Sequence, residues 1–282
     1  MLETKILNYL NYLGDSEYMA EVATSPGAVD TLNKLLQSNN EETVSYACLF
    51  ITDFVLSCSR NDICKQSWEK LESAIIPQLE HLVFANNHFI RKQVIYTLGK
   101  ICSYNSVPVL LHAFYELRDR DPILLPRLVG ELFWLGVDNR CDVIESMIVS
   151  KQYTTRWAVV FALEEFIYHL PNQEDETFLM RYKFCNHLRQ DSHPLVQAEA
   201  EYKYQVLELN RRKHKENMSK SDYKKQRKEL KKIQSFLSFS SVCSQFSNYM
   251  YKRNLHTYTT EDLEGFITAL LTTITANQST AM

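Results

Sequence analysis

One spacing of apolar residues recurs along the chain and restricts what it can fold into. A start residue is followed by apolar or small residues four, eight and eleven positions later. Steps of four, four and three place these side chains on one stripe of an α-helix, so each set predicts a helix with one buried face. The sets are Val44, Cys48, Thr52 and Val55; Ile90, Val94, Leu98 and Ile101; Leu124, Leu128, Leu132 and Leu135; Thr155, Val159, Leu163 and Phe166; and Val196, Ala200, Tyr204 and Leu207.

Each of these helices follows a polar turn and, before the turn, another apolar segment. The segments are AVDTLNKLLQS, AIIPQLEHLVF, SVPVLLHAFYE, DVIESMIVS and TFLMRYKFCNHL. The repeating unit is therefore a helical hairpin, which cannot cover its apolar face without a neighbouring hairpin. The start residues lie 46, 34, 31 and 41 positions apart, an irregular period within the range of stacked helix pairs. The sequence predicts an all-α solenoid.

Composition agrees with an all-helical chain. Only 6 glycines and 7 prolines occur in 282 residues, too few for the turns that many short strands need. The longest apolar runs, VPVLLHAF and ITALL, are too short to cross a bilayer, and the first residues do not have the pattern of an export signal. The 7 cysteines include no Cys-x-x-Cys pair, which favours a reducing compartment. We therefore expect a cytoplasmic protein.

Charge divides the chain into two parts. Residues 1–209 carry 18 Lys and Arg against 28 Asp and Glu, whereas residues 210–282 carry 13 against 6. The apolar repeat also stops after Leu209. We predict a repeat solenoid over 1–209, followed by a basic helical extension and cap over 210–282.

Two stretches within the repeats resemble known families. The segment IIPQLEHLVFANNHFIRKQVIYTLGKICSYNSVPVLLHAFYEL resembles the HEAT-repeat pattern, with Pro77 in a first helix and Ile90-Arg91 at the entry to a second. The segment SPGAVDTLNKLLQSNNEETVSYACLFI is similar to the sister armadillo pattern. The resemblance covers about residues 26–209 and implies a HEAT/armadillo-like solenoid. The sequence departs from the pattern at Leu125, where Arg91 and Arg156 occupy the equivalent positions.

The basic extension contains two helix-start signals. Ser219 and Asp222 form a capping box that predicts a helix start, and a second capped helix begins near Thr259 and Thr260. An apolar stripe follows the first signal, and lysines take the remaining faces of that helix. The stripe comprises Tyr223, Leu230, Ile233 and Leu237. The helix can therefore dock and still display its lysines.

Two interpretations of these lysines stay open. Residues 211–232 hold 11 Lys and Arg against 3 Asp and Glu, a charge suited to phosphates. The residues available to a nucleic acid are Lys224, Lys225, Arg227, Lys228, Lys231 and Lys232. However, this helix has one arginine, and its tyrosine belongs to the docking stripe. It therefore offers few arginine side chains and no free aromatic ring that could contact nucleic-acid bases. The pattern favours a solvated surface with weak, sequence-independent binding.

Motifs for catalysis are missing from the sequence. It has no glycine-rich phosphate loop, zinc-binding His-Glu-x-x-His or nucleophile elbow. Cys185, His187 and His193 lack a further ligand with suitable spacing, so we predict no metal and no cofactor. Among HEAT-like enzymes, the di-iron hydroxylases are excluded because no histidine is followed by glutamate.

Two other enzymatic branches of the HEAT-like proteins can be compared with the sequence. The bilin lyases share the short repeat units of residues 86–136 and stay an alternative. DNA glycosylases with helical repeats use residue types present here in Trp134, Trp157, Arg156 and Glu164. We interpret Trp134 as a core residue, and the acidic repeat region argues against a DNA cradle.

The resulting hypothesis is a non-enzymatic scaffold or adaptor that binds another protein. Stacked hairpins create an extended surface lined by their second helices. Arg91, Arg156 and Gln197 lie one step from the buried start positions and are expected on this surface. Trp157, close to a helix start, is expected to be an exposed aromatic anchor. The alternatives are a nucleic-acid-binding repeat protein that uses 211–232, and a bilin lyase-like protein.

Overall fold

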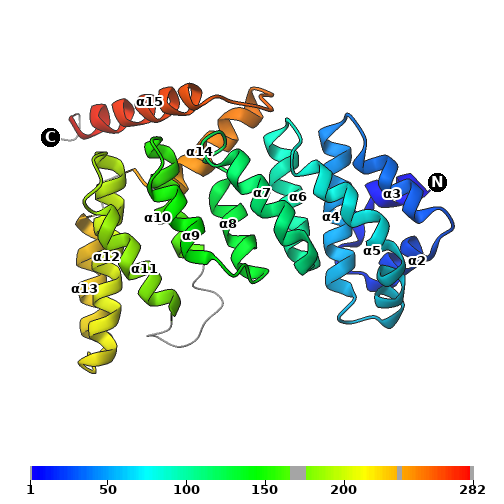
Figure 1. The fold of residues 1–282 in the computed structure, drawn as a ribbon, viewed down its shortest axis with the longest axis horizontal. Helices are drawn as coiled ribbons and strands as arrows, with labels where there is room; N and C mark the ends of the chain where they lie inside the picture. Colours follow the sequence, from blue (N-terminus) through cyan, green and yellow to red (C-terminus); the bar gives the residue numbers. More distant parts are fainter. Residues whose placement is uncertain (1, 166–175, 234–236, 280–282) are drawn as a thin grey trace. The chain divides into compact units, whose positions relative to one another are not determined.

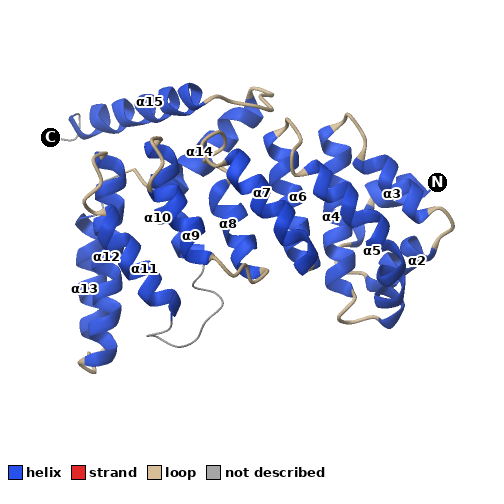
Figure 2. Cartoon of the chain, viewed as in Figure 1, coloured by secondary structure: helices blue, strands red, loops and turns tan. Residues whose placement is uncertain are grey.

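The computed structural model of the protein describes residues 2–165, 176–233 and 237–279 (Figure 1). These residues form helices and loops, with no strand among them, which confirms the predicted all-α class (Figure 2). Within the same ranges, no helix is long and apolar enough to cross a membrane.

The five predicted hairpins are present. Each consists of a first helix, a loop and a second helix. In chain order they are α3 (Ala28–Leu36) with α4 (Glu41–Ser57), α5 (Asp62–Leu82) with α6 (His88–Ile101), α7 (Val107–Leu117) with α8 (Leu125–Trp134), α9 (Arg140–Ile148) with α10 (Tyr153–Glu165), and α11 (Glu176–Leu188) with α12 (Pro194–Lys215). The wide first spacing of the repeat is accommodated by α5, which extends over 21 residues and includes Pro77. The chain is thus an all-α solenoid of helical hairpins, as the sequence predicts.

Most residues of the predicted apolar stripes form the core, whereas Val55, Ile101 and Tyr204 are only half-buried. Val94 and Leu98 of α6 and Leu128 and Leu132 of α8 are fully buried. Phe166, the last residue of the fourth set, lies outside the described residues. Burial of these faces is the main favourable term in folding, and each buried aliphatic side chain contributes about 1.5 to 3 kcal/mol.

The polar turns start the second helices by capping. Asn40 Oδ1 accepts a hydrogen bond from Thr43 N at 3.0 Å, and Asn87 Oδ1 accepts one from Phe89 N at 2.8 Å. These bonds satisfy backbone donors that the first turn of a helix leaves unpaired. The turn sequences NNEET and ANNH therefore both break one helix and begin the next.

The chain divides into two compact units. One comprises Met1–Glu116 and Arg127–Asp138, and the other comprises Leu117–Pro126 and Asn139–Met282. Before α3, the first unit also contains α1 (Leu2–Leu7), η1 (Tyr9–Tyr12) and α2 (Ser16–Thr24), and η2 (Tyr104–Ser106) precedes α7. In this unit α4 packs along α6, and α2 and α3 pack on α5. The predicted division at 209/210, which falls inside α12, stays a prediction.

The second unit contains the C-terminal extension. It adds α13 (Lys220–Ile233), α14 (Phe239–Lys252) and α15 (Thr260–Ser279). Helix α13 packs on α12 and α14 packs on α10, and Figure 1 shows α12 and α13 side by side.

Both predicted helix-start signals of the extension are confirmed. Asp222 N donates to Ser219 Oγ at 3.0 Å before α13, and Asp262 N donates to Thr259 Oγ1 at 3.2 Å before α15. The prediction that Leu237 continues the stripe of the first of these helices is wrong. Helix α13 ends at Ile233, and Leu237 is buried outside it.

Candidate functional site

Two arginines expected on the binding surface instead hold the loops of their hairpins. Arg91 Nη1 donates to the carbonyl of Ala85 at 2.6 Å, and Arg156 Nη1 donates to the carbonyl of Ser150 at 2.9 Å. Both bonds span six residues, so the two arginines are equivalent, as their positions in the repeat predict. Both side chains are largely covered. Both arginines therefore stabilise the loops between the two helices of their hairpins.

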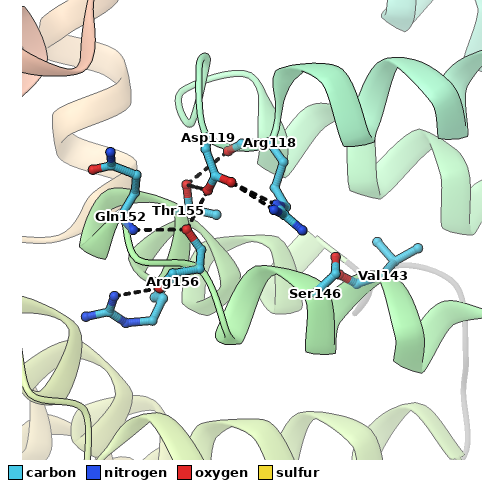
Figure 3. Close-up of polar contacts among 8 residues, drawn as sticks. Arg118, Asp119, Val143, Ser146, Gln152, Thr155 and Arg156 are labelled. Atoms are coloured by element: carbon cyan, nitrogen blue, oxygen red, sulfur yellow. Dashed lines mark hydrogen bonds and ion pairs between the residues drawn. The ribbon is translucent and has the colours of Figure 1, made fainter.

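Asp119 lies at the centre of a polar cluster between two loops (Figure 3). It accepts hydrogen bonds from Ser150 Oγ, from Thr155 Oγ1 at 3.0 Å and from Arg118 Nη2 at 2.9 Å. Burial acts to raise the pKa of Asp119, but the hydrogen bonds from Ser150, Arg118 and Thr155 outweigh it and lower the pKa. A carboxylate held so firmly ionised is a weak base, so this Ser–Asp contact is suited to joining loops rather than to activating a nucleophile.

Arg156 continues the connection to the next hairpin. Its Nε and Nη2 donate to the two carboxylate oxygens of Asp191 at 2.7 and 3.0 Å. Asp191 Oδ1 also accepts from His193 N at 2.8 Å, immediately before α12. A bidentate pair of this kind fixes geometry as well as charge. The loops α7–α8, α9–α10 and α11–α12 are therefore linked in series.

Trp157 is a core residue, and its expected exposure is wrong. The side chain is 0% exposed. Its Nε1 donates to Glu199 Oε2 at 2.6 Å, and its ring meets Phe239 edge-on at 5.3 Å. Glu199 also accepts from Phe239 N at 2.8 Å, so one carboxylate joins α10, α12 and the start of α14. Trp157 is buried because the C-terminal extension covers it.

Gln197 is exposed on α12, as expected. It is the only exposed residue of the four predicted for the partner-binding surface, and its role there stays a prediction.

Helices α6 and α8 approach closely in the first unit. A Cβ atom added to Gly99 would lie 2.0 Å from Oε2 of Glu131, so the absence of a side chain leaves room for this carboxylate. Glu131 is buried and pairs with Arg127 Nη1 at 3.2 Å. The close contact sets the two helices side by side with charged groups along the seam.

Tyr96 lies between two cations at this seam. Lys100 Nζ and Arg127 Cζ are each 5.1 Å from the centre of the Tyr96 ring. A cation within about 6 Å of an aromatic ring is attracted by its quadrupole. The tyrosine, Lys100 and Arg127 are all half-exposed, which gives the surface a positive and aromatic character.

Trp134 extends the same surface. It is 45% exposed, and its Nε1 donates to Cys102 Sγ at 3.0 Å, which orients the indole ring. The prediction that Trp134 is a core residue is therefore wrong. The available signal was spacing: Arg127, Glu131 and Trp134 each precede by one position the buried Leu128, Leu132 and Leu135. We refer to Tyr96, Lys100, Arg127, Glu131 and Trp134 as the α6/α8 face.

The lysines of α13 are exposed. Lys224, Lys225, Lys228 and Lys231 are all exposed, and Lys225 borders the groove between α12 and α13. Arg227 is half-buried, with its Cζ 6.0 Å from the Tyr202 ring. The side chains of Lys232 and Ile233 lie outside the described residues. Arg227 therefore belongs to the docking contact, and the four lysines form the outer surface.

A groove of about 660 Å³ runs between α12 and α13. Its charged lining mixes Arg189, Arg212 and Lys225 with Glu201, Glu208, Asp222 and Glu229. Arg189 stacks on Tyr204 with 4.3 Å between Cζ and the ring centre, and its Nε donates to Glu201 at 2.6 Å. The groove therefore carries charges of both signs and has no excess of positive charge.

Among the described residues, no group of three or more potential ligands could hold a metal ion. The Cys185 thiol of the predicted polar cluster is buried, and burial raises its pKa to about 12. A protonated thiol is a poor metal ligand and a poor nucleophile.

No family model matches the chain, and no curated protein is similar enough to count as a match. Several solved structures share the repeat architecture at low similarity. A designed armadillo-repeat protein in complex with the peptide (KR)4 is 15% identical, covers 71% of this chain and 95% of its own, and gives a TM-score of 0.39. Computationally designed armadillo-repeat proteins for modular peptide recognition give 15% identity, 71% and 95% coverage, and a TM-score of 0.38. At these scores the likeness carries no argument, and the fold rests on the packing described above.

Proposed function

We propose that the chain is a non-enzymatic scaffold that binds another protein, and that the α6/α8 face is the docking site. The observation that carries the proposal is Trp134, a large aromatic side chain on a second helix with nearly half of its surface exposed. Tryptophan, tyrosine and arginine dominate the energetic centres of protein interfaces. The α6/α8 face contains all three.

The geometry defines the kind of partner segment that the face suits. The Trp134 ring is oriented by its bond to Cys102, so little side-chain entropy is lost when an apolar group packs on it. Lys100, about one turn from Tyr96 on α6, is available to an acidic side chain, whereas Arg127 is paired with Glu131. The preferred ligand is an extended peptide that carries an apolar or aromatic residue close to an acidic one.

A displayed library of random linear peptides, panned on the purified chain, tests the proposal. We expect enriched peptides that share an aromatic or aliphatic residue and an acidic residue. Trp134→Ala should weaken their binding by about 2 kcal/mol, roughly 30-fold, as expected for an interface centre. Tyr251→Ala is the matched control, because Tyr251 is 74% exposed on α14 in the other unit.

Two results would contradict the proposal. Either no peptide is enriched, or the enriched peptides bind the Trp134→Ala and Tyr251→Ala chains equally well. A Trp134→Phe chain keeps an aromatic ring and removes the N–H bond to Cys102. Intermediate binding by this variant would separate the contact surface of the ring from its orientation.

Two further points belong to the proposal. A cytoplasmic location is supported by the seven free cysteines, of which Cys102 and Cys141 are exposed, since exposed thiols stay reduced in the cytosol. The bilin lyase-like alternative is tested by incubating the chain with free bilin. Transfer of the pigment to an acceptor protein would replace the scaffold proposal by an enzymatic one.

A further inference from the structure

We infer that the outer face of α13 binds the phosphate backbone of a nucleic acid without reading its sequence. This α13 lysine face comprises Lys220, Lys224, Lys225, Lys228 and Lys231, all of which are exposed. It lies in a different unit from the α6/α8 face and would contact a different class of partner. The inference is therefore independent of the proposed scaffold function.

The packing of α13 separates a docking side from a free side. Tyr223, Gln226, Arg227 and Leu230 are half-buried, and their spacing of three, one and three residues puts them on one side of the helix. Tyr223 Oη also donates to Asn210 Oδ1 at 2.8 Å on α12. The lysines occupy the rest of the circumference, so docking leaves them in solvent.

The lysine face is not neutralised by the protein around it. Within the described residues, none of its five lysines forms an ion pair or a hydrogen bond with an acidic side chain. Residues 211–232 carry 11 basic and 3 acidic side chains, a local charge of +8. Exposed lysines contribute little to folding, about 0 to 1 kcal/mol even when paired. A concentration of unpaired charge that folding does not need is available for an external anion.

The arrangement suits a polyphosphate. An α-helix rises about 1.5 Å per residue, so Lys220, Lys224, Lys228 and Lys231 extend over about 16 Å along one side. A DNA duplex presents about one negative charge for every 1.7 Å of its axis, so several phosphates lie within that length. Lysines supply mobile point charges and do not require the planar geometry that arginine forks impose.

Two other anionic partners are less well matched. A membrane-surface helix needs a free apolar face, but Tyr223 and Leu230 are turned toward α12. An acidic peptide would need a groove, and the neighbouring groove contains Glu201, Glu208, Asp222 and Glu229, which would repel it. A nucleic-acid backbone requires neither an apolar face nor a groove.

The surrounding tyrosines explain why bases would not be read. Arg189 lies 4.3 Å from the Tyr204 ring, and Lys213 lies 4.8 Å from the Tyr223 ring. Tyr182 and Tyr202 are likewise approached by Arg211 and Arg227, at 5.8 and 6.0 Å. Rings already occupied by the chain's own cations offer no platform on which a base can stack. Binding should follow the number of phosphates and be indifferent to sequence.

Fluorescence anisotropy with a labelled 20-base-pair duplex and a labelled single strand tests the inference. Affinity is measured from about 50 to 200 mM salt, the range over which counterion release is large. We expect both probes to bind at low salt, with equal affinity for unrelated sequences of the same length. Changing Lys224, Lys225, Lys228 and Lys231 together to Gln should reduce duplex affinity at least about tenfold and lower the slope of log K against log salt by about 3 to 4, since each phosphate contact contributes about 0.9.

A matched variant controls for the change in net charge. Lys65, Lys70, Lys92 and Lys151 are exposed on other helices or loops. Changing these four to Gln removes the same charge and should leave duplex affinity and the salt slope unchanged. Circular dichroism and melting temperature of both variants establish that they are folded.

Three outcomes would overturn the inference. The first is no binding of duplex or single strand at 50 mM salt. The second is equal loss in the two four-lysine variants, which would assign binding to overall charge. The third is tighter binding to phosphatidylserine vesicles or to polyglutamate than to the duplex at equal salt, which would assign the α13 lysine face to a membrane or to an acidic protein.

Discussion

Replacing Glu199 by glutamine should stabilise the second unit at alkaline pH and have little effect at acidic pH. The side chain is 1% exposed, and its Oε2 accepts hydrogen bonds from Trp157 Nε1 and Phe239 N. Burial raises the pKa of Glu199 from 4.5 to about 7, against the opposing effects of these donors and of Lys203. Glutamine keeps an oxygen acceptor and cannot ionise.

The sign and the size of this stability difference follow from the linkage between proton binding and folding. The pKa is higher in the folded chain, so the folded state binds the proton more tightly between pH 4.5 and about 7. The stability that Glu199 contributes is fully present below about pH 4.5 and is lost as pH rises through about 7. At about 1.4 kcal/mol for each pH unit, the loss amounts to about 3 kcal/mol. Glu199→Gln should therefore be more stable than the parent by up to about 3 kcal/mol at pH 8, with the two nearly equal at pH 4.

Urea unfolding at several pH values measures this difference. The chain has 3 tryptophans, so Trp68→Phe and Trp134→Phe in both proteins leave Trp157 as the fluorescent reporter of the second unit. The contributions of other titrating groups cancel in the difference between the unfolding free energies of parent and variant. An unchanged dependence of that free energy on urea shows that the unfolding transition is the same. Glu216→Gln, at an exposed glutamate, controls for the loss of one charge. A variant that is less stable at pH 8, or a difference independent of pH, would refute the reasoning.

Two further predictions concern helix packing. Gly99→Ala should destabilise the first unit by about 1 to 3 kcal/mol, because the new Cβ collides with the buried Glu131 side chain. A Cβ at Gly265 in α15 meets nothing within 4 Å, so Gly265→Ala should stabilise the second unit by about 0.5 to 1 kcal/mol. Thermal unfolding compares them, and a stabilising Gly99→Ala would mean that α6 and α8 are not in close contact. Leu98→Ala and Leu132→Ala, both at fully buried positions, should each cost about 2 to 5 kcal/mol in urea unfolding. Unchanged stability of both would show that the four-eight-eleven spacing does not mark the core.

The hairpins could be predicted because each depends on local information. Val94, Leu98 and their equivalents in the other repeats are buried, except for the half-buried Tyr204, since a helix with one apolar stripe has one way to face its neighbour. The capping box of Ser219 and Asp222 lies within four consecutive residues, and its bonds form as the sequence indicates. Patterns of this kind are complete within one or two turns of helix.

The binding surface required information from distant residues. Trp157 is buried because Glu199 and Phe239, 42 and 82 positions later, close over it, and no local pattern specifies that contact. The repeat spacing does predict that Arg91 and Arg156 occupy equivalent positions. The direction of a long side chain, however, is set by the acceptors that the loop presents, here carbonyls six residues earlier. Trp134 lies in an apolar segment, which predicts burial, but it precedes the buried Leu135 by one position and is therefore exposed.

The contacts of Tyr258 bear on how this chain can be shortened or varied during evolution. Its hydroxyl donates to Asp121 Oδ1 at 2.7 Å and accepts from Ile123 N at 3.2 Å, so the segment after α14 reaches back to the loop after α7. A chain that ended before α14 would take away the Tyr258 bond from Asp121 and the Phe239 N–H from Glu199, two carboxylates that are each 1% exposed. Buried carboxylates that lose donors are costly. Insertions should therefore be tolerated at the exposed turn between α12 and α13, whereas loss of the last helices should be accepted only together with changes at both carboxylates.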